Sequence, residues 1–280
     1  MTDRYTRDAI AAAREVAARF GLPADPAEVL HARSNVLVRL GAVVARVPAT
    51  TRLTRPGVEA WLRRDVALSA YLAGQGVRVV SPTADPPPGP HFAGGLPVTL
   101  WHFTPHDPDY RFRPAEVAES LAALHEALRG YPGELPANGP LVEIGTMLDR
   151  LFGDDPAPDQ LWGAVASIAT SLPDGPEQPL HGDAHPGNLI ATPDGPCWLD
   201  FEDTWHGPLG WDLACLATTP RLDGTAALAA YPDAPPAAEL APFVALRELF
   251  GVCWRFAIAR RFPDRQPEAE SALAAYLSGS

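Results

Sequence analysis

The segment at 179–203 constrains the fold and chemistry of this chain more than any other feature, because it holds the densest group of polar residues. Asp183 and Asn188 lie five positions apart in it, and Asp200 follows Asn188 by twelve residues, directly after the apolar run at 197–199. Short apolar runs around these residues are typical of β-strands. The sequence therefore predicts a β-rich segment whose loop presents carboxylate and amide groups to one point.

These residue types suit phosphoryl transfer. The spacing of Asp183 and Asn188 also occurs in the catalytic loop of protein kinases. The reaction needs an oriented hydroxyl group and cancellation of phosphate charge, and little covalent help from the protein. The carboxylate of Asp183 can accept or orient a hydroxyl proton. Mg²⁺ prefers hard oxygen ligands, which the carboxylate of Asp200 and the amide carbonyl of Asn188 provide.

Three motifs in this part of the chain carry a family resemblance. LHGDAHPGNLI at 180–190 is followed by WLDFED at 198–203 and GPLGWDLA at 207–214. Together they resemble the signature of the aminoglycoside phosphotransferase and choline kinase-like superfamily: His-Gly-Asp, His-x-x-Asn, Ile-Asp-Phe or Ile-Asp-Trp, then Gly-Pro and Asp-Leu-Ala. The resemblance implies a small-molecule kinase that uses ATP and Mg²⁺.

The same resemblance assigns roles to individual residues. It implies that Asp183 is the catalytic aspartate and that Asn188 and Asp200 bind magnesium. Asp212 matches a family aspartate thought to buttress the catalytic loop, and we expect its role to be structural. For His181 and His185 we expect hydrogen bonds that fix the loop rather than metal ligation, because no zinc-type ligand set accompanies them.

The expected fold class is α+β, in the bilobal arrangement of protein kinase-like folds. A length of 280 residues suits two lobes. We place a small β-rich N-lobe that binds the nucleotide at 1–103. A larger, mainly helical C-lobe at 104–280 carries the catalytic loop and the substrate site. The resemblance implies that the nucleotide binds between them.

Hydrophobic periodicity predicts the individual elements. In the first 105 residues it indicates helices at 5–20 and 57–73 and strands at 36–40, 43–47, 77–81 and 98–103. The buried faces expected for the two helices are Ile10, Val16, Ala17 and Phe20, and Ala60, Trp61, Val66, Ala67 and Leu72. Farther on, helices are predicted at 114–128, 141–152, 158–171, 210–217, 236–262 and 267–277. The helix at 114–128 should bury Val117, Leu121, Leu124 and Leu128, with His125 packed in the core.

The chain departs from the family where a strand lysine normally contacts ATP. All 22 basic residues are arginine, and Arg46 takes that place in the strand at 43–47. Arginine keeps the charge and can bind phosphate through two hydrogen bonds. The helix acid that pairs with this cation is best matched by Asp65, with Glu59 as the competing candidate. The alternative for Arg46 is a surface residue of a hairpin.

Two further segments are predicted to bind the nucleotide. No glycine-rich phosphate loop is present, and the polar turn at Ser34 and Asn35 occupies its position. Family members often use such a turn there. Residues Trp101, His102 and Phe103 fall where the family joins its lobes, so their backbone groups are expected to bind adenine. An ordinary core strand is the alternative there, and it is compatible with that role.

Charge and composition limit the partners. The net charge is −12, which argues against nucleic acid as the main partner. Residues 1–105 hold 12 Arg and 8 acids (+4), whereas residues 106–280 hold 10 Arg and 26 acids (−16). An acidic C-terminal part can attract a cationic acceptor, although solubility alone explains the charge equally well. Glu202 and Asp203 either face the substrate or are only solvated.

We therefore expect a cytoplasmic phosphotransferase acting on a hydroxyl of a small, cationic molecule of the aminoglycoside or amino-alcohol type. No apolar run approaches the eighteen or more residues of a membrane helix, so no membrane partner is expected. Two alternatives stay open: a metabolic kinase of choline, homoserine or sugar type, and a pseudokinase that binds nucleotide without turnover. The three widely spaced cysteines are expected to be buried free thiols. The sequence leaves the oligomeric state open.

Overall fold

The computed structural model describes residues 3–152 and 157–279. The chain divides into two compact units, unit 1 from Met1 to His106 and unit 2 from Asp107 to Ser280. The boundary lies three residues beyond the position expected from the sequence, between 103 and 104. The class is α+β, because strands dominate the first unit and helices the second.

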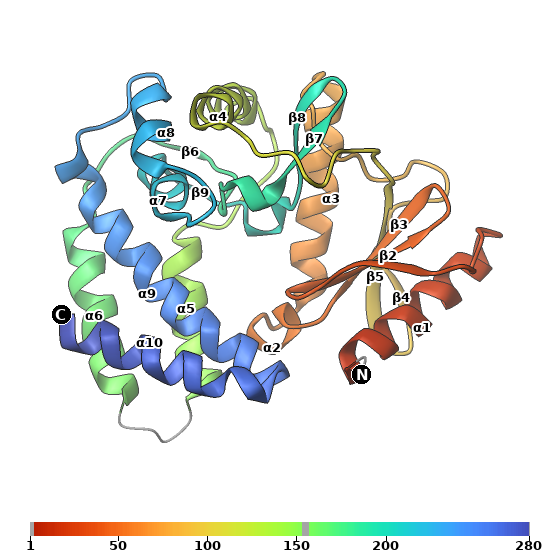
Figure 1. Cartoon of the computed structure of the whole chain (residues 1–280), viewed down its shortest axis with the longest axis horizontal. Helices are drawn as coiled ribbons and strands as arrows, with labels where there is room; N and C mark the ends of the chain where they lie inside the picture. The colour runs from red at the N-terminus through yellow and green to blue at the C-terminus, as the bar shows by residue number, and fades with distance from the viewer. Residues whose placement is uncertain (1–2, 153–156, 280) are drawn as a thin grey trace. The chain divides into compact units, whose positions relative to one another are not determined.

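Unit 1 is built on an antiparallel five-stranded sheet with the order β1-β2-β3-β5-β4. Helix α1 lies against this sheet (Figure 1). The strands are β1 (Glu28–Ala32), β2 (Asn35–Leu40), β3 (Val43–Pro48), β4 (His91–Ala93) and β5 (Leu96–His102). The helices are α1 (Arg4–Arg19), α2 (Thr51–Thr54) and α3 (Val58–Gly74).

The tight turn between β2 and β3 sets the register of the sheet centre. Leu40 faces Val43 across a turn whose Gly41 has a φ of +66°, a value that glycine adopts without a steric cost. All six residues of β3 are buried, because sheet neighbours lie on both sides of it and α1 covers the sheet. Small residues on α1 let the helix approach closely, and Ala9, Ala13 and Ala17 are fully buried there.

Several sequence predictions for unit 1 are wrong. The segment 77–81 is not a strand: Val79 is its one bridge residue, and Pro82, directly after the segment, forms an isolated bridge with Trp101. Pairing with β5 is limited to two backbone hydrogen bonds around Pro82, from the N–H of His102 to the carbonyl oxygen of Ser81 and from the N–H of Thr83 to that of Leu100. Proline has no N–H that could extend this pairing into a ladder. Strands β1 and β4 and helix α2 were not predicted. Phe20 was expected to be buried, but it follows the last helical residue and is 38% exposed.

The buried face of α3 also differs from the expected one. Ala60 and Ala67 are exposed, and of the five predicted residues only Leu72 is buried. The buried positions are Val58, Leu62, Asp65, Leu68, Ser69 and Leu72. A carboxylate occupies the middle of this face, where its ion pair with Arg46 satisfies the charge. Hydrophobic periodicity cannot locate a face that has an acid at its centre.

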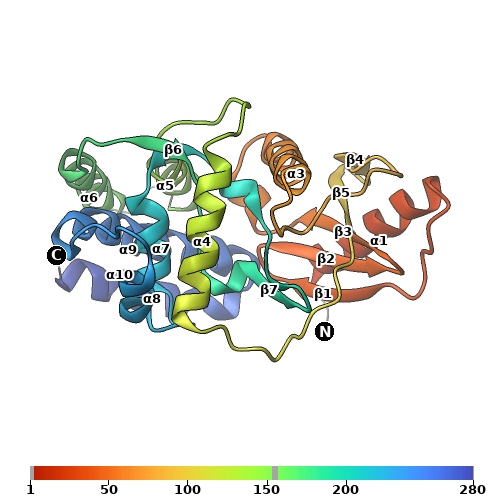
Figure 2. The same cartoon turned by 90° about the horizontal axis from the view of Figure 1, so that it is seen from above.

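Unit 2 consists of seven helices in the described residues, together with two small antiparallel sheets (Figure 2). The helices are α4 (Pro114–Leu128), α5 (Gly139–Leu151), α6 (Ala157–Ser171), α7 (Gly210–Thr218), α8 (Gly224–Ala230), α9 (Ala237–Arg261) and α10 (Gln266–Gly279). One sheet pairs β6 (Glu177–Pro179) with β9 (His206–Pro208), and the other pairs β7 (Leu189–Thr192) with β8 (Gly195–Trp198). Short 3₁₀ turns are η1 (Pro186–Asn188), η2 (Phe201–Asp203) and η3 (Pro263–Arg265).

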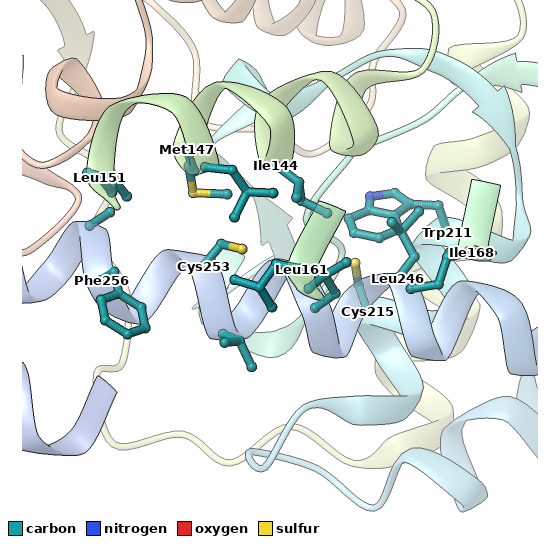
Figure 3. Packing of buried hydrophobic residues seen from close by; sticks show 14 of the residues in the cluster. Ile144, Met147, Leu151, Leu161, Ile168, Trp211, Cys215, Leu246, Cys253 and Phe256 are labelled. Atoms are coloured by element: carbon teal, nitrogen blue, oxygen red, sulfur yellow. The ribbon is translucent and has the colours of Figure 1, made fainter. Parts of the chain in front are cut away.

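The core of unit 2 surrounds α9, which packs against α5, α6, α7 and α10. Figure 3 shows side chains of α5, α6 and α7 meeting those of α9, with Met147, Leu161, Leu246 and Cys253 in the same cluster. On α4 the four predicted positions, Val117, Leu121, Leu124 and Leu128, are all buried. The three cysteines are buried free thiols, as expected. No helix among the described residues has the length and apolar character needed to cross a membrane.

Candidate active site

A buried carboxylate on α7 anchors the loop that carries Asp183. Asp212 accepts hydrogen bonds from the backbone N–H groups of His181, 2.7 Å, and Gly182, 2.9 Å. His125 of α4 also lies 2.9 Å from Asp212 through Nε2, and its Nδ1 lies 2.8 Å from the hydroxyl of Tyr231. Burial raises the pKa of Tyr231 to about 12, so its hydroxyl keeps its proton. Hydrogen bonds to backbone amides give Asp212 the structural role expected of it.

The loop can take this path only because position 182 is glycine. Gly182 has a φ of +89°, and a Cβ atom there would lie 1.9 Å from the carbonyl oxygen of Asp203. Its own carbonyl oxygen accepts a hydrogen bond from the indole Nε1 of Trp211, 2.7 Å away. The backbone that directly precedes Asp183 is therefore fixed by contacts with α7 and η2.

His181 connects this loop to the residue before Asp200. Its Nδ1 accepts a hydrogen bond from the backbone N–H of Asp183, 3.3 Å, and its Nε2 lies 3.1 Å from the carbonyl oxygen of Leu199. The ring is therefore neutral with its proton on Nε2. Burial lowers the pKa of His181 although Asp212, Asp183 and Asp200 act to raise it. No group of three or more potential ligands from His, Cys, Asp and Glu occurs within 3–152 and 157–279.

The carboxylate of Asp183 is contacted on both oxygens. Arg247 of α9 donates from Nη2 to Oδ1 at 2.6 Å. His185 Nε2 and Asn188 Nδ2 each lie 3.2 Å from Oδ2. Burial alone would raise the pKa of Asp183, but the charge of Arg247 and the contact with His185 hold it well below its usual range. Asp183 is thus an ionised acceptor at neutral pH.

The hairpin β7–β8 brings Asn188 and Asp200 to the same end. Leu189 pairs with Trp198, and the backbone N–H of Leu199 donates to the carbonyl oxygen of Asn188 at 3.1 Å. Asp200 follows directly in a left-handed conformation, with φ +70° and ψ +59°. A non-glycine residue held in this region marks a constrained position and suggests a functional one.

The donor groups at this end of the hairpin suit a magnesium ion. The Asn188 amide donates through its nitrogen to Asp183, so its carbonyl oxygen is the atom that a cation would contact. Asp200 adds a carboxylate. Mg²⁺ is commonly held by one or two carboxylates together with substrate phosphates and waters, not by a complete protein cage. The two residues fit that pattern.

In unit 1 the two charged residues expected near the phosphates form a buried ion pair. Arg46 Nη1 lies 2.6 Å from Asp65 Oδ2, and the two side chains are 6% and 0% exposed. Asp65, and not Glu59, is therefore the acid that pairs with Arg46. The alternative that Arg46 is a surface residue of a hairpin is wrong. Its contact with a nucleotide stays a prediction.

The polar turn before β2 is tied to the segment that follows β3. The carbonyl oxygen of Ser34 accepts hydrogen bonds from the N–H groups of Ala49, Thr50 and Thr51, at distances of 2.9 to 3.3 Å. The hydroxyl of Thr51 donates to Asn35 Oδ1 at 3.1 Å. These contacts fix the shape of the turn, and phosphate binding by Ser34 and Asn35 stays a prediction.

The segment predicted to bind adenine comprises the last two residues of β5, Trp101 and His102, and the next residue, Phe103. The backbone N–H of His102 donates to the carbonyl oxygen of Ser81, and that of Phe103 donates to Ala42, at 3.0 and 2.8 Å. Trp101 is buried, and its Nε1 donates to Thr99 Oγ1 at 2.9 Å. Two of the backbone donors in this segment are therefore engaged within unit 1, and adenine binding there is untested.

Comparison with known proteins identifies the family. The model of the phosphotransferase enzyme family matches residues 27–243, which include both the Arg46–Asp65 pair and the Asp183 loop. The chain belongs to this family. The family and its structural neighbours support a small-molecule phosphotransferase. No curated protein matches the sequence closely.

Solved structures similar to this family member share its fold. Choline kinase LicA from Streptococcus pneumoniae has a TM-score of 0.62 at 16% identity, covering 94% of this chain and 99% of that one. The amicoumacin kinase hAmiN, solved with AMP-PNP, Ca²⁺ and Ami, gives 0.65 at 13% identity, covering 94% and 95%. The aminoglycoside enzyme APH(2")-IIIa, solved with GDP and kanamycin, gives 0.61 at 15% identity, covering 91% and 94%. The protein kinase-like fold expected from the sequence is confirmed.

Two residues of this site were missed by the sequence analysis. Arg247 lies 64 positions from the aspartate that it contacts, and Tyr231 lies 106 positions from His125. Neither belongs to a local motif, so only their place in the fold reveals them. Glu202 is buried, which excludes the reading that it is merely solvated, whereas Asp203 is half-buried.

Proposed function

We propose that this phosphotransferase moves the γ-phosphate of ATP to a hydroxyl group of a small molecule. One observation carries the proposal: Asp183 is held as an ionised acceptor, in contact with Asn188, on a loop whose backbone is bonded to Asp212. A reaction with a loose transition state needs this kind of fixed geometry more than it needs a strong base.

Each residue of the loop has a defined part in the proposed reaction. Asp183 accepts a hydrogen bond from the acceptor hydroxyl and aligns its oxygen for attack. Asn188 and Asp200 would hold Mg²⁺, which, when bound, neutralises charge on the phosphates. His181 and Asp212 keep the loop in place through backbone hydrogen bonds.

In unit 1 we assign the nucleotide phosphates to Arg46, with Asp65 orienting its guanidinium group. The assignment predicts that Arg46→Lys raises the KM for ATP several-fold. Lysine keeps the positive charge but lacks the planar guanidinium group that binds phosphate through two hydrogen bonds. Arg46→Ala would remove the buried cation that pairs with the Asp65 carboxylate, at a cost of about 3–5 kcal/mol in stability. The double variant Arg46→Met/Asp65→Leu removes both charges, so it should fold and raise the KM for ATP further than Arg46→Lys does.

Steady-state kinetics with varied ATP would measure these effects. Arg19→Met, at an exposed site on α1, is the matched control and should leave the KM unchanged. A double variant with a normal KM for ATP would show that the pair only stabilises unit 1.

We further propose that the acceptor is cationic, as in an aminoglycoside or amino alcohol. Residues 106–280 carry −16 by the charges of their side chains, and exposed acids such as Glu248 lie on the same helix as Arg247. The structural neighbours include a choline kinase and enzymes solved with kanamycin and gentamicin. A negative electrostatic field speeds the encounter of the protein with cations, and dissolved salt screens this field.

The acceptor proposal predicts that kcat/KM for the best acceptor falls as ionic strength rises from about 0.01 to 0.15 M, where the Debye length shrinks from about 30 to 8 Å. The measurement uses a panel of choline, ethanolamine, kanamycin and gentamicin, with a neutral sugar as the control. If kcat/KM did not change with ionic strength, or if the best acceptor were neutral, the charge of residues 106–280 would no longer support a cationic acceptor. Either result would favour a metabolic kinase of another type.

The same panel tests the proposed function itself. Turnover of ATP or GTP in Mg²⁺ buffer, followed by mass detection of a phosphorylated acceptor, is the expected result. Nucleotide binding without turnover for any acceptor would instead support the alternative of a pseudokinase. The chain retains Asp183, Asn188 and Asp200, and this set favours the enzyme.

A further inference from the structure

The contact between Arg247 and Asp183 joins the long helix α9 to the centre of the proposed reaction. Arg247 Nη2 donates to Asp183 Oδ1 at 2.6 Å, and the side chains are 21% and 25% exposed. Both groups are thus reachable by a small molecule yet sheltered enough for the ion pair to be stronger than one at the surface. No motif of the sequence accounts for this arginine.

Hydrogen-bond directions around Asp183 distinguish its two oxygens. The backbone N–H of Gly187 donates to His185 Nδ1 at 2.8 Å, so that nitrogen is an acceptor and the proton of the neutral ring lies on Nε2. His185 Nε2 then donates to Asp183 Oδ2, and Asn188 Nδ2 donates to the same oxygen, both at 3.2 Å. Two donors fill the two lone-pair positions of Oδ2.

Oδ1 is different, because Arg247 is its one hydrogen-bond donor among the described side chains. A carboxylate oxygen accepts about two hydrogen bonds. One position on Oδ1 is therefore open to a further donor. A hydroxyl group that approaches Asp183 can donate to this position without displacing any bond that the structure contains.

The guanidinium group of Arg247 is itself held in place. It lies over the rings of Trp211 and Phe250, 5.7 and 5.6 Å from their centroids. Trp211 is in turn bonded through Nε1 to the carbonyl oxygen of Gly182, the neighbour of Asp183. Arginine over fixed aromatic faces loses little further freedom when it binds a carboxylate.

We propose that Arg247 is a positioning residue, which holds the Asp183 carboxylate so that Oδ1 keeps one lone-pair position for the acceptor hydroxyl. This inference rests on the proposed phosphotransferase function. Without Arg247 the carboxylate is held only at Oδ2, by His185 and Asn188, so the direction of Oδ1 and of its open position is less restricted. A misplacement of about 1 Å costs about 100-fold in rate, so the effect should fall on kcat and spare nucleotide binding.

The test compares three variants in the phosphotransfer assay with the best acceptor of the choline, ethanolamine, kanamycin and gentamicin panel. Arg247→Met should lower kcat by about 10- to 100-fold and leave the KM for ATP within about twofold. Arg247→Lys should retain an intermediate kcat, since it restores one charged donor without the fork. Arg255→Met is the matched control, because Arg255 is exposed on the same helix and donates to the carbonyl oxygen of Gly251.

A second comparison separates positioning from a structural role. Arg247→Met added to Asp183→Asn should cause almost no further loss of kcat, because Arg247 acts through the carboxylate. Thermal unfolding of each variant shows whether it folds. The inference would be overturned, and the proposed function left intact, by a normal kcat for Arg247→Met. The same holds if Arg247→Met lowers kcat by the same factor in the Asp183→Asn protein as in the wild-type protein. Absence of turnover by the wild-type protein would overturn the proposed function and the inference with it.

Discussion

Replacement of Asp183 by asparagine is expected to lower kcat by about 10²- to 10⁴-fold, the usual contribution of a group that accepts or orients the reacting proton. The isosteric amide cannot satisfy the donors that surround it. Arg247 faces one oxygen of Asp183, and His185 and Asn188 face the other, so either orientation of an amide places its NH₂ group against a donor. The side chain at position 183 therefore loses both its negative charge and its fixed orientation.

Nucleotide affinity should survive this change, because Asp183 does not take part in the proposed contacts with ATP. Calorimetry with an ATP analogue measures the affinity, and steady-state kinetics measures kcat. Asp194→Asn is the control, since Asp194 is an exposed acid in the turn of the neighbouring β7–β8 hairpin. Near-normal turnover in Asp183→Asn would show that another group orients the acceptor hydroxyl.

The sequence predicted those residues of the site that lie close to one another in the chain. Asp183, Asn188 and Asp200 lie within 18 positions of one another, on a loop and one hairpin. Turn geometry brings such residues together without help from distant segments. Asp212 was recognised by resemblance, and its bonds to the loop backbone agree with a structural role.

Features that depend on distant contacts were not predicted. Nothing in the sequence pattern of α9 distinguishes Arg247. It contacts Asp183 only because α9 packs against α7 beside the loop. The face of α3 was misplaced because its centre is Asp65, whose burial depends on Arg46 nineteen positions away. Strands β1 and β4 lie at the two edges of the sheet, where little burial marks them in the sequence.

The loss of Asp200 is expected to abolish Mg²⁺-dependent nucleotide binding. Even the outer-shell partners of a metal ligand are each worth about 10- to 100-fold in metal affinity, and a directly ligating carboxylate is worth at least as much. The wild-type protein should bind an ATP analogue tightly only when Mg²⁺ is present. Asp200→Ala and Asp200→Asn should both bind the analogue weakly, with or without Mg²⁺.

Backbone strain is the competing explanation for such a loss, because Asp200 has a φ of +70°. Asparagine tolerates this left-handed conformation, whereas alanine there costs on the order of 1–2 kcal/mol. Asp200→Asn therefore isolates the charge. Asp233→Ala isolates the strain, since Asp233 is exposed with a φ of +52° and has no proposed contact with nucleotide. Weak binding by Asp200→Asn together with normal binding by Asp233→Ala would assign the effect to the lost carboxylate. Equal affinity of the wild-type protein with and without Mg²⁺ would instead place the nucleotide site away from Asp200.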